Sequence, residues 1–182
     1  MNPSLLSKLL ELSTEAGEII MKFHKHSSDY STKDDTTPLT AADKASHEFL
    51  VNALEKLTPN IPILSEESSH IPFTVRQSWN EYWLIDPLDG TRDFIDGSPD
   101  FCISIAFIKQ NYPTFGLIYS PFNKVHYYRL AHESSIKIVN REVSKIVTTK
   151  PKRWKKIVIG RYSTNNKKLK EHLKLKTNFE TF

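Results

Sequence analysis

The sequence has little cysteine and no long apolar run, and each shortage excludes a kind of protein. Its single cysteine, Cys102, cannot form an internal disulfide, which favours a reducing compartment. No stretch approaches the roughly 20 apolar residues that a membrane-spanning helix needs. Charged residues interrupt the apolar positions near the N-terminus, which argues against a secretory signal peptide. We therefore predict a cytoplasmic protein without a transmembrane segment, which leaves room for peripheral association with the inner membrane.

Internal repeats and low-complexity segments are also lacking, and the 182 residues have the composition of a globular protein. The net charge of +4 conceals an asymmetry: residues 1–140 carry 12 basic and 18 acidic side chains, whereas residues 141–182 carry 13 and 3. The acidic part suits a divalent cation and the basic part an anionic substrate, although a solvated lysine-rich surface is the simpler explanation. The shift predicts an N-terminal α+β domain, 1–140, followed by the beginning of a second α/β domain, 141–182.

Hydrophobic periodicity predicts two helices followed by a run of strands. Apolar residues recur every three or four positions from Leu5 to Phe23 and again from Ala42 to Leu57, with a polar loop at 27–37 between them. Two short apolar runs follow at 61–64 and 82–85. Further strands are predicted at 101–107, 114–119, 124–130, 135–139 and 157–160, and a last helix from about 163 to 175. Helices followed by a meander of strands are typical of an α+β fold.

Two of the predicted strands end in acidic residues. One run delivers Asp86 to its end, and Pro87 then turns the chain so that Asp89 returns to the same side. The run before it ends at Glu66, and if the two strands are neighbours the three carboxylates gather. Carboxylates so close repel one another unless a cation neutralises them. Their hard oxygen atoms favour Mg²⁺ or Mn²⁺ over zinc.

An anion site is predicted beside this cation site. A helix that begins near Thr91 would aim its free N–H groups at an anion, and the two sites together describe hydrolysis of a phosphate ester. An ordinary Pro-x-Asp-Gly turn explains residues 87–90 more simply, and a solvated pair explains Glu66 and Glu67. Only the combination of both acidic strand ends favours the functional interpretation.

Three segments, in order, resemble the signature of the inositol monophosphatase superfamily. They are residues 33–43, residues 63–68 and residues 83–95, the last containing Asp86-Pro87-Leu88-Asp89-Gly90-Thr91. The flanking residues are similar to the CysQ-type 3'(2'),5'-bisphosphate nucleotidase branch. The resemblance implies a layered α/β sandwich and a Mg²⁺-dependent phosphatase that converts 3'-phosphoadenosine 5'-phosphate to AMP and phosphate. A sugar phosphatase of the inositol monophosphatase kind is the alternative substrate class.

The same resemblance implies which residues hold the metal, with two or three Mg²⁺ ions per site in the family. Glu66, Asp86 and the backbone carbonyl of Leu88 would hold the first ion. Asp86 would bridge to a second ion that Asp89 also holds.

Substrate binding and catalysis are implied for an overlapping set. The backbone of Asp89, Gly90 and Thr91 would bind the phosphate, with Glu66 and Leu88 also in contact with the substrate. Thr91 and Glu66 would position and activate the attacking water, and Asp35 would order a further metal ion or that water. A solvated loop residue is the simpler interpretation of Asp35.

One departure from the family pattern concerns its second metal site. The family completes this site with an aspartate that follows a tryptophan near the start of a late helix, but none of Trp79, Trp83 and Trp154 precedes an aspartate. We therefore expect the second site to lack one ligand and the second domain to be incomplete at residue 182. Such a chain should be poorly stable alone and weakly active or inactive.

Three other interpretations remain open. A haloacid dehalogenase-type phosphatase also ends a strand in aspartate, but there one residue separates the two aspartates, whereas here Pro87 and Leu88 intervene. A non-catalytic remnant would bind a nucleotide or partner without turnover. Nucleic acid is disfavoured as a partner, because Trp154 and Tyr162 are the only aromatics in the lysine-rich part before residue 176. An oligomer is compatible with all of these interpretations.

Overall fold

The computed structural model describes residues 2–24, 30–32, 38–68, 71–148, 167, 168 and 171. The chain divides into two compact units, Met1–Val147 and Thr148–Phe182. The predicted strand at 157–160 lies outside the described residues, and the predicted helix from 163 to 175 is described, as helical, only at 167, 168 and 171. No helix in the described part of the chain has the length and apolar character needed to cross a membrane.

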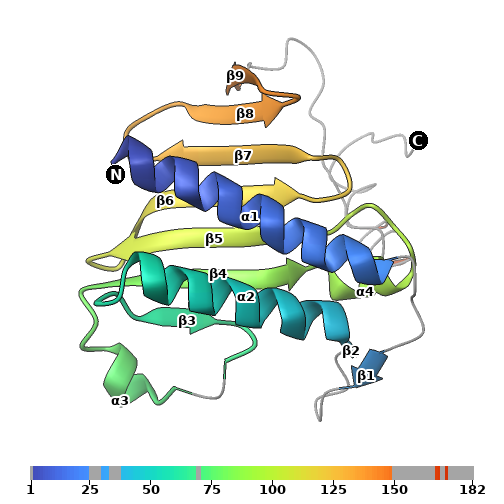
Figure 1. The fold of residues 1–182 in the computed structure, drawn as a ribbon, viewed down its shortest axis with the longest axis horizontal. Coiled ribbons are helices and arrows are strands. Elements are labelled where there is room, and N and C mark those ends of the chain that lie inside the picture. The colour runs from blue at the N-terminus through green and yellow to red at the C-terminus, as the bar shows by residue number, and fades with distance from the viewer. Residues whose placement is uncertain are drawn as a thin grey trace. The chain divides into compact units, whose positions relative to one another are not determined.

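The first unit combines helices with a seven-stranded sheet, which confirms the α+β prediction (Figure 1). The sheet order follows the chain, β3-β4-β5-β6-β7-β8-β9, and only β3 and β4 run parallel. The helices are α1 (Pro3–His24), α2 (Ala41–Leu57), α3 (Phe73–Arg76) and α4 (Thr91–Ile95). The sheet strands are β3 (Ile63–Ser65), β4 (Glu81–Asp89), β5 (Cys102–Lys109), β6 (Tyr112–Ser120), β7 (Val125–Leu130), β8 (Ser135–Val139) and β9 (Glu142–Ile146).

Two strand pairings lie beyond the sequence prediction, one in the seven-stranded sheet and one in a separate two-stranded sheet. Strand β9 pairs with β8, so this hairpin spans the boundary predicted after residue 140. The segment predicted as the loop 27–37 contains β1 (Tyr30–Thr32), which pairs antiparallel with β2 (Pro38–Thr40). Three-residue strands are too short to produce a readable alternation of apolar and polar positions.

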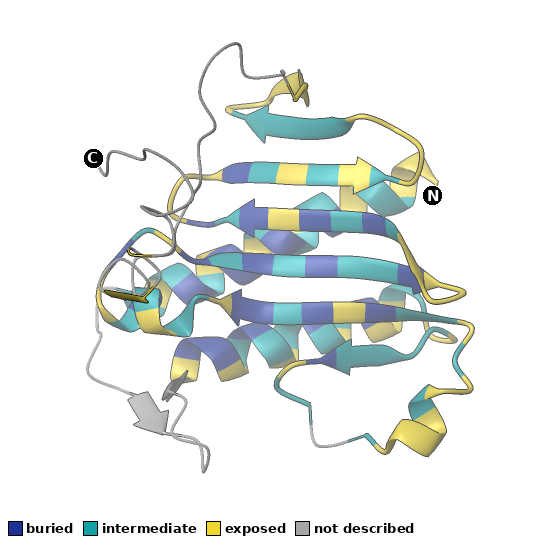
Figure 2. Cartoon of the chain, turned by 180° about the vertical axis from the view of Figure 1, so that it is seen from behind, coloured by how far each residue is buried: buried dark blue, intermediate teal, exposed yellow. Residues whose placement is uncertain are grey.

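The two long helices lie on one face of the sheet and form the core with it (Figures 1 and 2). Of the apolar stripe predicted for α1, Leu9 and Ala16 are buried and the other positions are only partly buried; Ser13, Gly17 and Ile20 complete the buried face. Asn2 caps the helix by accepting a hydrogen bond from the backbone N–H of Ser4 at 2.9 Å. Along β4 from Trp83 to Pro87, and along β6 from Phe115 to Tyr119, the buried residues alternate with partly buried or exposed ones, as Figure 2 shows. The opposite sheet face therefore carries exposed apolar side chains, among them Leu84, Ile118 and Tyr127.

Helix α1 approaches the sheet most closely at Gly17. A Cβ atom at this position would stand 2.5 Å from Cε1 of Tyr119 and 3.2 Å from Cβ of Pro121. Tyr119 cannot move away easily, because it is buried and stacks on His126 with ring centroids 4.2 Å apart. His126 in turn lies within hydrogen-bonding distance of Ser13 on α1, with Nε2 and Oγ 3.1 Å apart.

We expect Gly17→Ala to destabilise the protein by about 1–2 kcal/mol, because overpacking outweighs the gain in helix propensity. Urea denaturation would measure the change. The matched control is Ser7→Ala on the exposed side of α1, which gains propensity without a new contact and should leave stability unchanged or slightly higher. A Gly17→Ala variant at least as stable as the wild type would contradict this packing.

Candidate metal- and phosphate-binding site

Parallel pairing places Glu66 beside Asp86. Strand β3 pairs with β4 so that Ser65 lies opposite Ile85, and the next residues along the two strands are Glu66 and Asp86. The backbone N–H of Glu66 donates to the carbonyl of Ile85 at 3.1 Å, which continues the pairing past the end of β3. The two predicted strands are therefore neighbours, and we call Glu66 and Asp86 the acidic pair.

A β-bulge, rather than a turn at Pro87, brings Asp89 back to the side of Asp86. Strand β4 continues through Asp89, and in its pairing with β5 the step from Asp86 to Asp89 lies opposite the shorter step from Ser104 to Cys102. The extra residue reverses the alternation of side chains along the strand. Pro87 and Leu88 are consequently both buried, and Asp89 is exposed.

Crowding of carboxylates changes the protonation of Asp86. Its pKa is raised from 3.8 to about 7, first because it is partly buried, then because of the charge of Glu66 and a hydrogen bond with it, and then because of the charge of Asp89. The backbone N–H of Leu88 opposes the shift by donating to Oδ1 of Asp86 at 3.1 Å. Without a cation, the acidic pair therefore retains a proton close to neutral pH.

Cys102 is a further neighbour of this site, and the sequence does not mark it, because a lone cysteine on a later strand forms no motif with the acidic residues. Its Sγ lies 3.8 Å from Oδ2 of Asp89, on the strand that pairs with β4. Burial, followed by the charge of Asp89, raises the pKa of the thiol from 9.0 to about 11. The thiol is therefore protonated at physiological pH.

We expect Cys102 in the folded, metal-free protein to react with iodoacetamide about 100-fold more slowly at pH 8 than the same residue in the urea-unfolded chain. The reaction requires the thiolate, and a pKa of about 11 instead of 9.0 lowers the thiolate fraction by that factor. The rate should keep rising well above pH 9. A rate that levels off near pH 9 would show that Asp89 and burial do not act on this thiol.

The backbone after Asp89 forms a tight turn that only glycine fits. Gly90 has φ +89°, and a Cβ atom there would stand 2.8 Å from the backbone oxygen of Asp100. Helix α4 begins at the next residue, Thr91, as predicted, but is a single turn. Oγ1 of Thr91 donates to the carbonyl of Leu88 at 3.1 Å. We call residues 89–91 the Gly90 turn.

Helix α2 supports both strand ends through two polar side chains. The buried Ser46 donates its hydroxyl to the carbonyl of Pro87 at 2.9 Å, and Nδ1 of His47 lies 2.8 Å from Oγ of Ser65. Sequence reasoning assigned no role to either residue. Ser46 and His47 belong to no recognisable sequence motif. Their contacts with the strand ends form only when α2 packs on the sheet.

The carboxylates of Glu66, Asp86 and Asp89 lie near one another but do not point at one common metal position. Among the residues that the structure describes, no three His, Cys, Asp or Glu side chains form a group placed to hold a metal ion. The acidic pair is in contact and Asp89 acts on it through its charge. The acidic pair offers only carboxylate oxygens, and these repel each other when both groups are ionised. Such a pair fits a hard divalent cation. Asp35, the remaining predicted catalytic residue, lies outside the described residues.

The comparisons with known proteins identify the family. Residues 2–181 match the inositol monophosphatase family, and the chain belongs to it. Among its relatives, the 3'(2'),5'-bisphosphate nucleotidase CysQ of Aggregatibacter actinomycetemcomitans is 44% identical over 126 residues, 69% of this chain and 47% of that protein. The CysQ protein of Haemophilus influenzae is 35% identical over 169 residues, 92% of this chain and 63% of that protein. The chain thus spans about half to two thirds of the length of these two relatives.

Solved structures share the fold, and one of them is described as a bacterial member of the inositol monophosphatase family. CysQ from Bacteroides thetaiotaomicron superposes with a TM-score of 0.69 at 24% identity, covering 93% of this chain and 69% of that one. The suhB protein of Bartonella henselae superposes with a TM-score of 0.66 at 25% identity, covering 74% of this chain and 52% of that one. These likenesses confirm the predicted fold of the inositol monophosphatase type.

Proposed function

We propose that this chain carries the cation- and phosphate-binding residues of a Mg²⁺-dependent phosphatase that converts 3'-phosphoadenosine 5'-phosphate to AMP and phosphate. The observation that supports the proposal most is the contact between Glu66 and Asp86 at the ends of two parallel strands. The names of the CysQ relatives favour the nucleotide substrate. We also propose a cytoplasmic location, as the sequence predicts.

In this proposal the acidic pair and the carbonyl of Leu88 would hold one Mg²⁺ ion, and Asp86 and Asp89 would hold a second. When bound, the cations supply charge stabilisation for the phosphoryl group and lower the pKa of a coordinated water molecule. The chain contributes a pair of carboxylates whose repulsion the cation relieves. The raised pKa of Asp86 in the metal-free protein reflects its burial first and then this repulsion.

The Gly90 turn binds the phosphate in this proposal. The absence of a side chain at Gly90 lets a phosphate oxygen approach the backbone N–H groups of residues 89–91, which then act as donors. The Thr91 hydroxyl and Glu66 orient a water molecule in line with the bond to be broken. Its oxygen attacks phosphorus, Glu66 accepts its proton, and the bond from phosphorus to the 3' oxygen of the ribose breaks. The 3' oxygen keeps the bonding electron pair and takes up a proton from solvent, so that it leaves as the ribose hydroxyl. Asp35 completes the proposed set.

The test is release of inorganic phosphate from 3'-phosphoadenosine 5'-phosphate, compared with inositol 1-phosphate, with and without Mg²⁺. We expect Mg²⁺-dependent release from the nucleotide, at the low rate of a chain whose second metal site lacks one ligand. This release should be lost in Glu66→Gln and retained in Glu81→Gln. The control removes one carboxylate from the opposite end of β4, where Glu81 pairs with Lys109 at 3.4 Å. Preference for inositol 1-phosphate would make the chain a sugar phosphatase, and nucleotide binding without turnover would make it a non-catalytic binding protein.

A further inference from the structure

Four aromatic rings join the end of α1 to the region of the Gly90 turn. The ring centroid of His24 lies 5.2 Å from that of Phe94, 5.3 Å from that of Phe101 and 5.8 Å from that of Phe122. Phe94 and Phe101 also meet edge to face, with centroids 5.1 Å apart. These separations are those of favourable aromatic pairs. We call the four residues the aromatic cluster.

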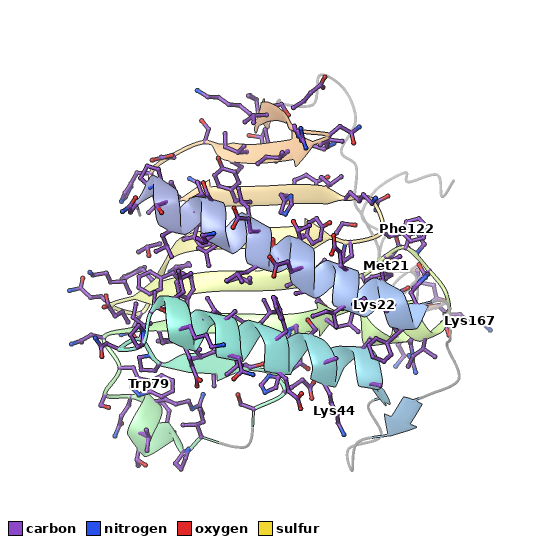
Figure 3. The ribbon with its side chains drawn as sticks, in the orientation of Figure 1. Met21, Lys22, Lys44, Trp79, Phe122 and Lys167 are labelled. Carbon is purple, nitrogen blue, oxygen red and sulfur yellow. The ribbon has the colours of Figure 1, made fainter. Side chains whose placement is uncertain are left out.

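The members of the aromatic cluster come from four separate segments of the chain. His24 is the last residue of α1, Phe94 lies in α4, Phe101 directly precedes β5, and Phe122 lies between β6 and β7. Figure 3 shows Phe122 beside the C-terminal end of α1, close to Met21 and Lys22. His24 touches all three phenylalanine rings, and it therefore connects segments that are otherwise distant in sequence.

Two members of the aromatic cluster border the Gly90 turn directly. The backbone N–H of Phe94 donates to the carbonyl of Gly90 at 3.0 Å. Cα and Cβ of Phe101 lie 3.3 and 3.4 Å from the place where a Cβ atom of Gly90 would stand. Both phenylalanines are buried. The Gly90 turn thus contacts both Phe94 and Phe101, and His24 packs against both rings.

The imidazole of His24 contributes packing rather than a hydrogen bond at Nε2. This nitrogen is buried and has no hydrogen-bond partner among the described residues. A buried polar atom without a partner is unfavourable, and a phenylalanine ring in the same place would avoid that penalty. The contribution of His24 to the cluster is therefore the presence of its flat ring, which phenylalanine can reproduce.

We propose that His24 is a positioning residue: its ring holds Phe94 and Phe101 in place and, through them, the backbone of the Gly90 turn. The consequence for phosphate binding rests on the proposed function, whereas the effect on the turn does not. The inference links the end of α1 to the geometry of a site to which α1 contributes no predicted ligand.

The test compares His24→Ala with His24→Phe in the full chain, with Ile20→Val as the control for lost packing elsewhere on α1. Ile20 is fully buried and lies outside the aromatic cluster. The first measurement is amide hydrogen exchange at Phe94, referenced to the Trp83 amide, which donates to the carbonyl of Pro62 in the core. We expect His24→Ala to raise the ratio of the Phe94 exchange rate to the Trp83 exchange rate about tenfold. His24→Phe and Ile20→Val should leave this ratio unchanged.

The second measurement is the affinity for inorganic phosphate in the presence of Mg²⁺. We expect His24→Ala to weaken it about tenfold and His24→Phe to restore it. An exchange ratio unaffected by His24→Ala, or a His24→Phe variant as impaired as His24→Ala, would overturn the inference. If the wild type binds no phosphate while the exchange results hold, the proposed function fails and the positioning of the turn stands.

Discussion

Replacing Asp86 by asparagine is expected to slow Mg²⁺-dependent phosphate release about a thousandfold. The same change is expected to stabilise the metal-free protein above pH 7. The loss of activity follows from removing the carboxylate proposed to bridge two cations. The gain in stability follows from the raised pKa of Asp86, which reflects the unfavourable burial of its charge beside Glu66. The two effects are opposite in sign, which distinguishes a functional carboxylate from one that supports the fold.

The pH range in which Asp86→Asn stabilises the protein follows from the pKa shift of Asp86. Asp86 has a pKa of about 7 when folded, against an ordinary value of 3.8, so the folded state retains a proton that the unfolded chain releases. The stability that this proton contributes is complete below pH 3.8 and is lost as the pH rises through 7. Because Asp86 is partly exposed, we discount the nominal shift for solvent screening and expect a difference of about 1–2 kcal/mol.

Urea denaturation of wild type and Asp86→Asn at pH 5 and pH 8, without divalent ions, measures this difference. We expect the variant to be the more stable protein at pH 8, with a smaller difference at pH 5. Addition of Mg²⁺ at pH 8 should stabilise the wild type and have little effect on the variant. A variant that is less stable at pH 8 without metal would mean that Asp86 has favourable partners in the fold.

Gly90→Ala is expected to weaken phosphate binding about 100-fold and to lower the free energy of unfolding by about 2–4 kcal/mol. A left-handed residue with a side chain is strained, and the new Cβ would stand 2.8 Å from the backbone oxygen of Asp100. Relief of this contact would move the Gly90 turn away from the backbone of Asp100. The donors of residues 89–91 then no longer converge on one phosphate.

Variants at two other glycines separate the effect of backbone strain from that of the close contact with Asp100. Gly97 also has a positive φ, +72°, but nothing lies within 4 Å of an added Cβ, so Gly97→Ala reports the backbone strain alone. At Gly116 an added Cβ has open space and φ is not positive, so Gly116→Ala should be nearly neutral. Isothermal titration with phosphate and Mg²⁺, together with urea denaturation, measures all three variants. Phosphate affinity unchanged in Gly90→Ala would exclude the Gly90 turn as the binding site.

The sequence predicted the parts of this fold that depend on local patterns. Hydrophobic periodicity identified α1 and α2, and the acidic residues at two strand ends predicted the place of the candidate site. The neighbouring positions of Glu66 and Asp86 were expected on the condition that β3 and β4 pair, and the structure meets that condition.

What the sequence could not predict depends on partners distant in the chain. The β-bulge at residues 87–88 is defined by the register against Cys102 and Ser104, and a single strand does not reveal it. Cys102 becomes a neighbour of Asp89 through the same pairing. His24 gains its contacts from residues about 70 to 100 positions later, and no local pattern marks such a cluster.

Anomalous diffraction from crystals of the chain soaked in Mn²⁺ tests the central claim most directly, because Mn²⁺ replaces Mg²⁺ at oxygen sites and is located by its own signal. We predict a peak about 2.1 Å from carboxylate oxygens of both Glu66 and Asp86, and a loss of that peak in Asp86→Asn. Well-ordered carboxylates with no peak beside them, or a peak only at other residues, would contradict the account.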